Sequence, residues 1–374
     1  MKIIWGFLCL FFLIFFHELG HFIAAKMFGV KVEAFSIGFG PVLLHKKRRG
    51  TDYRLSLIPL GGYCAMKGEK DFQKSLDAHL SYIHAESDSL YGVHPLKRIA
   101  IAFAGPFFNA LFASFAFFLI AMIGYTYYSY SPKIILVDEL NPEIHSAARE
   151  AGLLSGDIIT KINNIPIENF SDIVTEISIR PDENVQVEVL RGEQPLVFSV
   201  HTDFDKESGT GKIGVAADTT SPKQYESIRY SFFPALWQGI KETGKAICLT
   251  IRGIAILFKG ANLENSVSGP ARIVDMMGGV VTESFSVSIK AGIVNMCNFM
   301  AYISVSLFIM NLLPIPILDG GLILFAFIEL VARRKISPKV LYYIQFVGIA
   351  FILFMLVIGL WGDTKYFIAQ WKAN

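Results

Sequence analysis

Charged residues are scarce in this sequence. Lys, Arg, Asp and Glu make up 18% of its 374 residues, whereas a soluble domain usually carries about a quarter. Apolar residues take their place, at 53% of the chain, and four apolar stretches span residues 3–25, 99–127, 291–313 and 340–361. Each reaches the length of about 20 residues with which a helix crosses a bilayer. The composition predicts a membrane protein and excludes an ordinary soluble enzyme.

Cysteine is also rare, and no pair has Cys-x-x-Cys spacing. The four residues are scattered along the chain as Cys9, Cys64, Cys248 and Cys297. This spacing argues against a disulfide framework and against a cysteine-bound metal. The net charge is only +2, and no basic run with interleaved aromatic residues is present, so we expect no nucleic-acid partner.

The charges are unevenly distributed. Basic residues gather between the first two apolar stretches and again at 333–339, whereas residues 131–230 are rich in acids. Because cytoplasmic loops carry excess Lys and Arg, the two basic loops are expected on the cytoplasmic side of the membrane. The N-terminus, the middle segment and the C-terminus are then extracytoplasmic. Residues 1–16 also resemble a signal peptide, but the cleavage site would be poor and cleavage would remove the motif described below.

The pattern predicts four regions. Residues 1–130 hold the first two spans and a strand-like loop (30–38 and 53–66, turning at 46–50) that dips into the membrane from the cytoplasmic side. Residues 131–220 form a soluble domain, and 70–95 a loose loop. Residues 221–290 include an amphipathic helix at 235–259, which lies on the membrane or packs on the soluble domain. Residues 291–374 contain the last two spans.

The middle segment has its own signature. Strand-like runs occur at 133–137, 157–163, 185–190 and 196–200, and a helix is expected at 171–179 with Ser171 as its N-cap. The run Ala-Gly-Leu-Leu-Ser-Gly-Asp-Ile-Ile at 151–159 resembles the Ala-Gly-Leu-x-x-Gly-Asp-x-Ile signature of PDZ domains. The fold class expected is therefore a multi-pass α-helical membrane protein of about four transmembrane helices, with a membrane-associated β-hairpin loop and an inserted PDZ-like α/β domain.

The chemistry-bearing motif lies inside the first apolar stretch. His17-Glu18-Leu19-Gly20-His21 fits H-E-x-x-H, in which two imidazoles at i and i+4 share one face of a helix and reach one metal. Glu18 then lies beside a metal-bound water as general base. Ionisable residues within a span are costly and usually functional. The alternative, a polar cluster capping the cytoplasmic end of the span, explains the placement less well.

A third ligand is expected from the third span. Asn311-Leu-Leu-Pro-Ile-Pro-Ile-Leu-Asp319-Gly-Gly breaks the helix with two prolines, and irregular backbone at membrane depth is tolerated where it is buried or lines a cavity. Asp319 is the candidate third ligand, although on composition alone Asp-Gly-Gly is equally typical of an ordinary turn at the membrane surface.

These motifs, in this order around the PDZ-like insertion, resemble the site-2 protease family of intramembrane zinc metalloproteases, in its bacterial RseP-like branch. The resemblance implies Zn²⁺ held by His17, His21 and Asp319, with Glu18 as catalytic base. It further implies that Asn311 contacts the substrate backbone and that Gly38 and Gly40 belong to a substrate-guiding β-loop. Gly105-Pro-Phe-Phe-Asn109 resembles another family motif, for which helix packing and catalysis are both open. The best-known enterobacterial members carry two PDZ domains, and this sequence shows one.

The family resemblance implies substrates that are single-span membrane proteins, such as anti-sigma-factor-like regulators, or remnant signal peptides. The PDZ-like domain would bind a new C-terminus or exclude bulky proteins, and the sequence leaves both open. Two other classes remain: an ion-translocating transporter and a membrane-anchored PDZ scaffold. The absence of internal repeats disfavours the transporter, and the scaffold leaves the intramembrane His and Glu unexplained. The assignment of zinc rather than another divalent metal rests on the family resemblance as well as on ligand type.

Overall fold

The computed structural model describes residues 2–80, 82–220, 222–260 and 268–373. The chain divides into two compact units. Unit 1 comprises Met1–Ile123, Tyr230–Ile247 and Ser268–Asn374; unit 2 comprises Gly124–Arg229 and Cys248–Val267, of which 261–267 lie outside the described residues. Residues 221 and 261–267 of the expected 221–290 region are therefore not described. The first boundary lies at Ile123 rather than at the expected 130, and no boundary lies near the division expected at 290, because Ser268–Asn374 belong together to unit 1.

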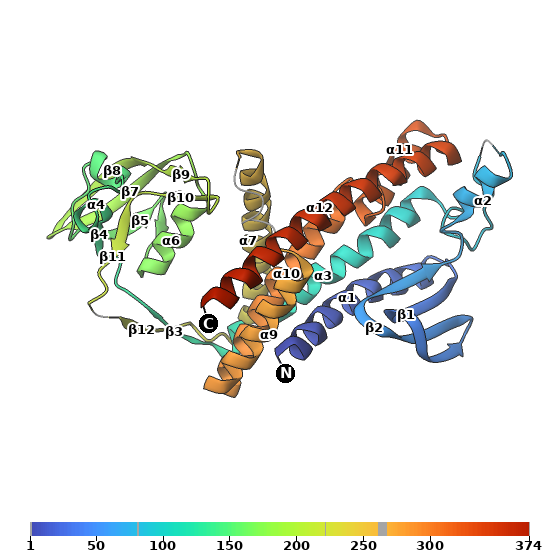
Figure 1. Cartoon of the computed structure of the whole chain (residues 1–374), viewed down its shortest axis with the longest axis horizontal. Coiled ribbons are helices and arrows are strands. Elements are labelled where there is room, and N and C mark those ends of the chain that lie inside the picture. Colours follow the sequence, from blue (N-terminus) through green and yellow to red (C-terminus); the bar gives the residue numbers. More distant parts are fainter. Residues whose placement is uncertain (1, 81, 221, 261–267, 374) are drawn as a thin grey trace. The chain divides into compact units, whose positions relative to one another are not determined.

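Four helices of unit 1 are long and apolar enough to cross a membrane: α1 (Lys2–Met27), α3 (Pro95–Ile123), α10 (Ile289–Leu312) and α12 (Pro338–Ala373). They coincide with the four apolar stretches of the sequence, and Figure 1 shows all four running along roughly the same direction. Of these, α3 packs against α1 and α10. Helix α12 continues beyond the stretch at 340–361 and is 36 residues long. Two shorter helices, α9 (Pro270–Val287) and α11 (Asp319–Ala332), complete the bundle.

Helix α3 is packed against α1, α10 and α11. Close approach to α1 depends on Gly20, where a Cβ atom would lie 2.3 Å from the carbonyl oxygen of Ala104. At the start of α3, the buried guanidinium of Arg98 forms an ion pair with Glu329 of α11. The second oxygen of Glu329 accepts the N–H of Ile336 at 3.1 Å. Buried charges are retained where they are paired and hydrogen-bonded, so this pair fixes α11 to α3.

The helix expected at 235–259 is α7 (Phe232–Phe258). Its first part, to Ile247, belongs to unit 1 and the rest to unit 2. In unit 1 it packs on α3, where Ser114 Oγ donates to Thr243 Oγ1 at 3.0 Å. Neither expected placement of this helix, on the membrane surface or on the soluble domain, accounts for that contact. Small residues explain it, because a Cβ on Gly239 would lie 2.5 Å from the Ser114 carbonyl oxygen.

The strand-like loop forms two long antiparallel strands, β1 (Val32–Arg48) and β2 (Thr51–Met66). Arg49 and Gly50 join them with positive φ angles of 48° and 78°, as a two-residue type I′ turn requires. Both strands are bent, so residues 34–37 have partners on two sides: 52–55 on one and 62–65 on the other. Segment 61–66 is therefore an edge strand with respect to the strand pairings of the described residues.

The 70–95 segment is more ordered than the expected loose loop. It contains helix α2 (Asp71–Asp77). Phe72 of this helix and Ile83 are buried against Leu341 of α12. Apolar burial accounts for the order, because removing such side chains from water stabilises the docked segment.

Unit 2 contains a four-stranded sheet in the order β6-β5-β7-β8, three two-stranded sheets and helix α6. Its core is a cluster of aliphatic side chains such as Ile159, Ile173 and Val187. The elements are β3 (Thr126–Ser129), β4 (Ile134–Leu136), α4 (Val137–Leu140), α5 (Ala147–Glu150), β5 (Ile158–Ile162), β6 (Ile165–Pro166), α6 (Phe170–Ser178), β7 (Asn184–Arg191), β8 (Gln194–His201), β9 (Asp203–Asp205), β10 (Thr210–Lys212), β11 (Val215–Ala217) and β12 (Lys223–Glu226).

The expected N-cap of the helix in unit 2 was wrong by two residues. Asn169, not Ser171, caps α6: its side chain accepts the N–H groups of Ser171 and Asp172, and the Asp172 carboxylate accepts the N–H of Asn169 in return. This reciprocal capping box starts the helix one residue before Ser171, whose hydroxyl bonds instead to Ser129.

Candidate metal centre and active site

His17 and His21 lie one turn apart on the inward face of α1. Both are buried, with side-chain exposures of 11% and 8%. Their Nε2 atoms are 3.2 Å apart, so both imidazoles point at one position, as expected for i and i+4 on a helix. The helix itself follows from its sequence, which is almost wholly apolar from Ile3 to Phe16.

Asp319 is brought to this position by a break in the chain. Helix α10 ends at Leu312, and α11 begins at Asp319, a helix that the sequence analysis did not predict. The connection contains Ile317 with φ of +89°, a conformation that costs a β-branched residue about 1–3 kcal/mol. It turns tightly, because a Cβ on Gly320 would lie 2.2 Å from the carbonyl oxygen of Leu313. This turn places Asp319 at the first residue of α11.

The three side chains converge. His17 Nε2 lies 3.2 Å from one Asp319 oxygen, and His21 Nε2 lies 3.3 Å from the other. All three ligand atoms fall within 4.8 Å of one another. A tetrahedral zinc ion with bonds of about 2.0–2.1 Å separates its ligand atoms by about 3.3 Å. Two imidazoles and a carboxylate at these separations therefore fit zinc and leave the fourth position for water or substrate.

Glu18 borders the same cavity. The cavity has a volume of ≈ 730 Å³ and is lined by His17, Glu18, His21 and Asp319 together with residues of β2, α2, α3, α10, α11 and α12. The backbone N–H of Cys64 in β2 interacts with the Glu18 carboxylate. A Cβ on Gly62 would lie 3.6 Å from Glu18 Cγ. The edge strand 61–66 thus passes directly beside the expected base.

Helix α3 contacts both histidines from behind. His21 Nδ1 lies 2.9 Å from the carbonyl oxygen of Ile101, and His17 Nδ1 lies 3.0 Å from the side-chain amide of Asn109. Metal-bound histidines usually place the second ring nitrogen on such a partner, which orients the ring. A Cβ on Gly105 would lie 2.2 Å from His21 Nε2, so this glycine makes room for the ring.

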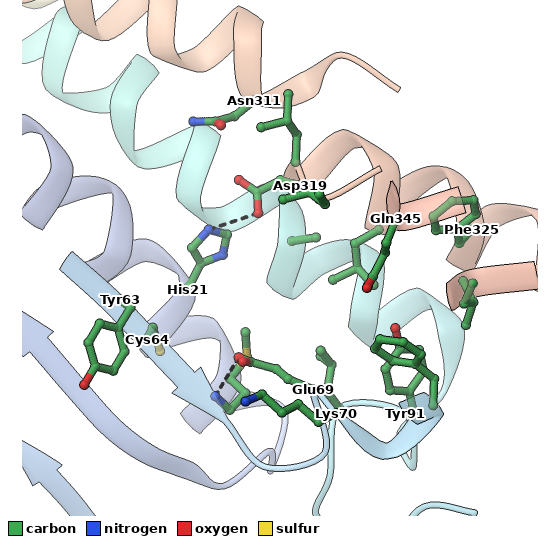
Figure 2. Close-up of a pocket in the computed structure, with 18 of the residues that line it drawn as sticks. His21, Tyr63, Cys64, Glu69, Lys70, Tyr91, Asn311, Asp319, Phe325 and Gln345 are labelled. Atoms are coloured by element: carbon green, nitrogen blue, oxygen red, sulfur yellow. Dashed lines mark hydrogen bonds and ion pairs between the residues drawn. The ribbon is translucent and has the colours of Figure 1, made fainter. Parts of the chain in front are cut away.

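The three expected substrate-binding residues fall in two places. Asn311 lines the cavity, and Figure 2 shows it on α10 near Asp319. Gly38 and Gly40 lie in β1 and are absent from the described lining of this cavity. Both have φ above +80°, and a Cβ on Gly38 would lie 2.8 Å from the Ser56 carbonyl oxygen. These glycines permit the bend of β1. Glycine is favoured there because it adopts a left-handed backbone conformation and has no Cβ to clash with the neighbouring strand.

Two cavity features escaped the sequence analysis. One is the backbone of the edge strand, because a main-chain N–H leaves no mark in the sequence. The other is Glu69, which lies across the cavity from Asn311 (Figure 2) and accepts the N–H of Met66 at 2.7 Å. Although Glu69 is partly open to solvent, the surrounding cavity walls desolvate its carboxyl and raise its pKa more than the Met66 N–H lowers it. Glu69 stands at the edge of a polar stretch, where nothing in the local pattern distinguishes it.

Comparisons with known proteins agree with this geometry. The model of peptidase family M50 matches residues 5–355. Proteins named as candidate zinc metalloproteases are similar over nearly the full chain: one from Treponema pallidum is 36% identical (98% of this chain, 99% of that one). One from Campylobacter jejuni is 34% identical (96% and 92%), and one from Helicobacter pylori is 33% identical (95% and 97%).

Among solved structures, the HtrA3 PDZ domain bound to a phage-derived ligand (FGRWV) is similar over 28% of this chain and 92% of its own length, at 20% identity and a TM-score of 0.14. The family match covers most of the chain and includes the converging residues His17, His21 and Asp319. The chain is a zinc-dependent metalloprotease of the membrane and belongs to peptidase family M50, the site-2 proteases.

Proposed function

We propose that this protease hydrolyses peptide bonds within or near the transmembrane segments of other membrane proteins. The observation that carries the proposal is the convergence of His17, His21 and Asp319 beside Glu18, where both histidines and Glu18 belong to a helix (α1) long and apolar enough to cross a bilayer. A site built into such helices acts on substrates that reach it from the membrane. Neither a transporter nor a scaffold needs three metal-ligating side chains at zinc spacing next to a general base.

His17, His21 and Asp319 hold the metal in this proposal. Zinc bound there supplies Lewis acidity, which activates water and stabilises the negative charge that develops on the scissile carbonyl oxygen. Glu18 takes the proton of the attacking water and passes it to the leaving amine. The Cys64 N–H lies beside the Glu18 carboxylate and helps to orient it.

The substrate is held as a strand. A transmembrane helix hides its carbonyl groups in i→i−4 hydrogen bonds, so it must unwind before cleavage. Edge segment 61–66 presents backbone groups beside Glu18, and an extended peptide can add to such an edge. Asn311 contacts the substrate backbone from α10. Gly38 and Gly40 act less directly, by giving β1 the bend that places residues 34–37 behind the edge strand.

The PDZ-like unit acts outside the cytoplasm. Within unit 2, a cavity of ≈ 770 Å³ lies along α6 and the start of β11, lined by apolar side chains such as Ile173, Ile177 and Val215. An apolar groove beside a strand suits an extended peptide. This cavity favours the binding of C-termini, left by an earlier cut, over exclusion of bulky proteins alone.

The membrane is the bacterial inner membrane. The basic loops face the cytoplasm, and the N-terminus, unit 2 and the C-terminus lie outside. The active site lies towards the cytoplasmic side, because His17 follows about 21 Å of helix from Ile3. Substrates are single-span regulators of the anti-sigma-factor type or remnant signal peptides.

Metal content tests the proposal without knowledge of the substrate. Purified wild-type protein in detergent, never exposed to chelator, should hold about one zinc per chain. His17→Ala and Asp319→Ala should each lose it, whereas His84→Ala, at an exposed position, should not. Reconstitution with a single-span substrate then tests cleavage. Wild-type protein that binds no zinc when zinc is resupplied would defeat the metal centre, and zinc binding without cleavage of any membrane substrate would defeat the proposed substrate class.

A further inference from the structure

Helix α3 meets the outer nitrogens of both histidines, but with different chemistry. His21 Nδ1 faces a backbone carbonyl oxygen, that of Ile101, at 2.9 Å. His17 Nδ1 faces the side-chain amide of Asn109 at 3.0 Å. Both Nε2 atoms point to Asp319. The state of each Nδ1 therefore decides whether the corresponding Nε2 can offer a lone pair to a metal.

The carbonyl oxygen of Ile101 allows only one tautomer of a neutral His21. A carbonyl oxygen only accepts hydrogen bonds, so Nδ1 of a neutral His21 must carry the proton and donate it. Nε2 then carries the lone pair and points at the metal position. The backbone of α3 thus fixes the metal-binding tautomer of His21 without any contribution from a side chain.

His17 has no such fixed partner, because an amide can face it in two ways. With Nδ2 of Asn109 toward His17, Nδ1 of the ring accepts and Nε2 carries the proton, which prevents metal binding through Nε2. In that orientation, Oδ1 of Asn109 is buried without a hydrogen-bond partner. The reverse orientation places Oδ1 on Nδ1–H. The two orientations have the same heavy-atom positions and differ in which atom is nitrogen and which is oxygen.

Asn109 is well placed to act on the ring. It is fully buried, with an exposure of 0%. Its backbone carbonyl accepts the hydroxyl of Ser304 on α10 at 2.8 Å, which fixes the position from which the side chain extends. Asn109 is not among the described residues that line the cavity, so it touches His17 rather than substrate.

We propose that Asn109 is a positioning residue, which turns its carbonyl oxygen toward His17 Nδ1–H when the metal is bound and so selects the tautomer that offers Nε2 to zinc. The inference rests on the proposed zinc site. It assigns the polar residue of the Gly105–Asn109 segment a role distinct from both open alternatives, helix packing and direct catalysis. Together, Ile101 and Asn109 make α3 the outer support of both imidazoles.

The test compares three variants in the full chain. Asn109→Leu keeps the approximate volume and removes the hydrogen bond; Asn109→Asp keeps an acceptor oxygen. Ser114→Ala is the matched control, because it removes a polar contact of the same helix with α7, away from the metal position. Zinc affinity is measured by chelator competition in detergent. The visible spectrum of the cobalt-substituted protein reports the ligand geometry, and thermal unfolding of the metal-free proteins reports folding.

Loss of an outer partner of a metal ligand usually weakens metal binding by about 10–100-fold. We expect this loss in Asn109→Leu, together with an altered cobalt spectrum. We expect near wild-type affinity and spectrum in Asn109→Asp, and no change in Ser114→Ala. Wild-type affinity in Asn109→Leu would overturn the inference, and so would equal losses in the Leu and Asp variants, which would indicate packing alone. A wild-type protein that binds no zinc would instead overturn the metal centre itself.

Discussion

A Cβ atom on Gly105 would lie 2.2 Å from Nε2 of His21 and 2.5 Å from Cε1 of the same ring. Real Cβ atoms do not approach so closely, so any larger residue at 105 must push the ring off its position. Helix propensity alone would make Gly105→Ala stabilise the helix, because Ala in a helix interior is about 1 kcal/mol more favourable than Gly. The two effects can therefore be told apart experimentally.

We predict that Gly105→Ala lowers zinc affinity at least about 10-fold, by analogy with other losses of ligand orientation, while the helix content stays unchanged. Zinc content after dialysis against a weak chelator measures the effect. Gly244→Ala on α7 is the control, because a Cβ there meets no atom within 4 Å. Full zinc retention in Gly105→Ala would show that the imidazole can shift without leaving the metal.

Replacing Glu18 by Gln removes the base and leaves the metal ligands intact. Loss of a general base usually costs about 10²–10⁴ in rate, so we predict a fall of that size in cleavage of a reconstituted single-span substrate. Zinc content should remain at the wild-type level, because Glu18 is not among the converging ligands. A variant that keeps more than a tenth of the wild-type rate would remove Glu18 from the mechanism.

Substrate unwinding can be tested in the substrate. Gly and Pro in a helix interior cost about 1 and 3 kcal/mol relative to Ala, so they lower the free energy of unwinding near the scissile bond. We predict that replacing them by Leu slows cleavage, with a larger effect for Pro. Initial rates with matched substrates measure this, and a Gly or Pro outside the cleaved region serves as control. Equal rates throughout would argue against unwinding as a required step.

In unit 2, Asp157 is a buried carboxylate that receives two hydrogen bonds from Arg191, both at 2.8 Å, and one from the N–H of Leu154 at 2.9 Å. Burial opposes ionisation, but these bonds outweigh it and lower the pKa of Asp157. We predict that Asp157→Asn destabilises unit 2 by about 2 kcal/mol at pH 7, a typical loss for bonds to a charged group.

The pH dependence has a definite sign. Because the folded pKa lies below that of the unfolded chain, the carboxylate contributes its stability fully above the usual aspartate range near pH ~4. The contribution is lost as the pH falls through the folded value. Hydrogen exchange of the unit 2 core in wild type and Asp157→Asn should therefore differ at pH 7, and the difference should shrink progressively as the pH falls below about 4. A difference that persists undiminished at low pH would indicate a packing effect.

The buried Arg98–Glu329 pair, with side chains 4% and 5% exposed, gives a further prediction. Arg98→Met leaves Glu329 as an unpaired buried charge, which typically costs about 3–5 kcal/mol. The double variant Arg98→Met/Glu329→Gln removes both charges and should recover most of the loss. Thermal unfolding in detergent compares the two. If the double variant is as unstable as the single one, packing of the Arg98 side chain, including its contact with the Tyr91 ring, is the larger contribution.

Much of the membrane part could be predicted because its signals are local. Long apolar runs predicted α1, α3, α10 and α12, and the spacing of His17 and His21 predicted their shared face. Asp319 was identified as a candidate from the two prolines before it. The sequence could not predict that it begins a further helix, α11, because that helix depends on tight turns around Gly320 and Gly321 and on contact with α3.

The remaining parts depend on contacts between distant segments. The double pairing of residues 34–37 follows from bends in β1 and β2, and alternation of apolar and polar residues does not report a bend. The roles of Ile101 and Asn109 require α3 to pass behind α1 at a particular height. The N-cap at Asn169 was missed because three of four consecutive residues there, Asn169, Ser171 and Asp172, are favourable capping types.

The ligands of the metal centre are divided between the two ends of the chain. His17 and His21 are synthesised with the first span, whereas Asp319 emerges some 300 residues later. During biosynthesis, the first span with His17, Glu18 and His21 is therefore made long before the expected third ligand. A chain that stalls or is truncated before α11 lacks Asp319 and has no complete site. If Asp319 is the third ligand, the order of residues along the polypeptide would delay proteolytic activity until the C-terminal helices have been made.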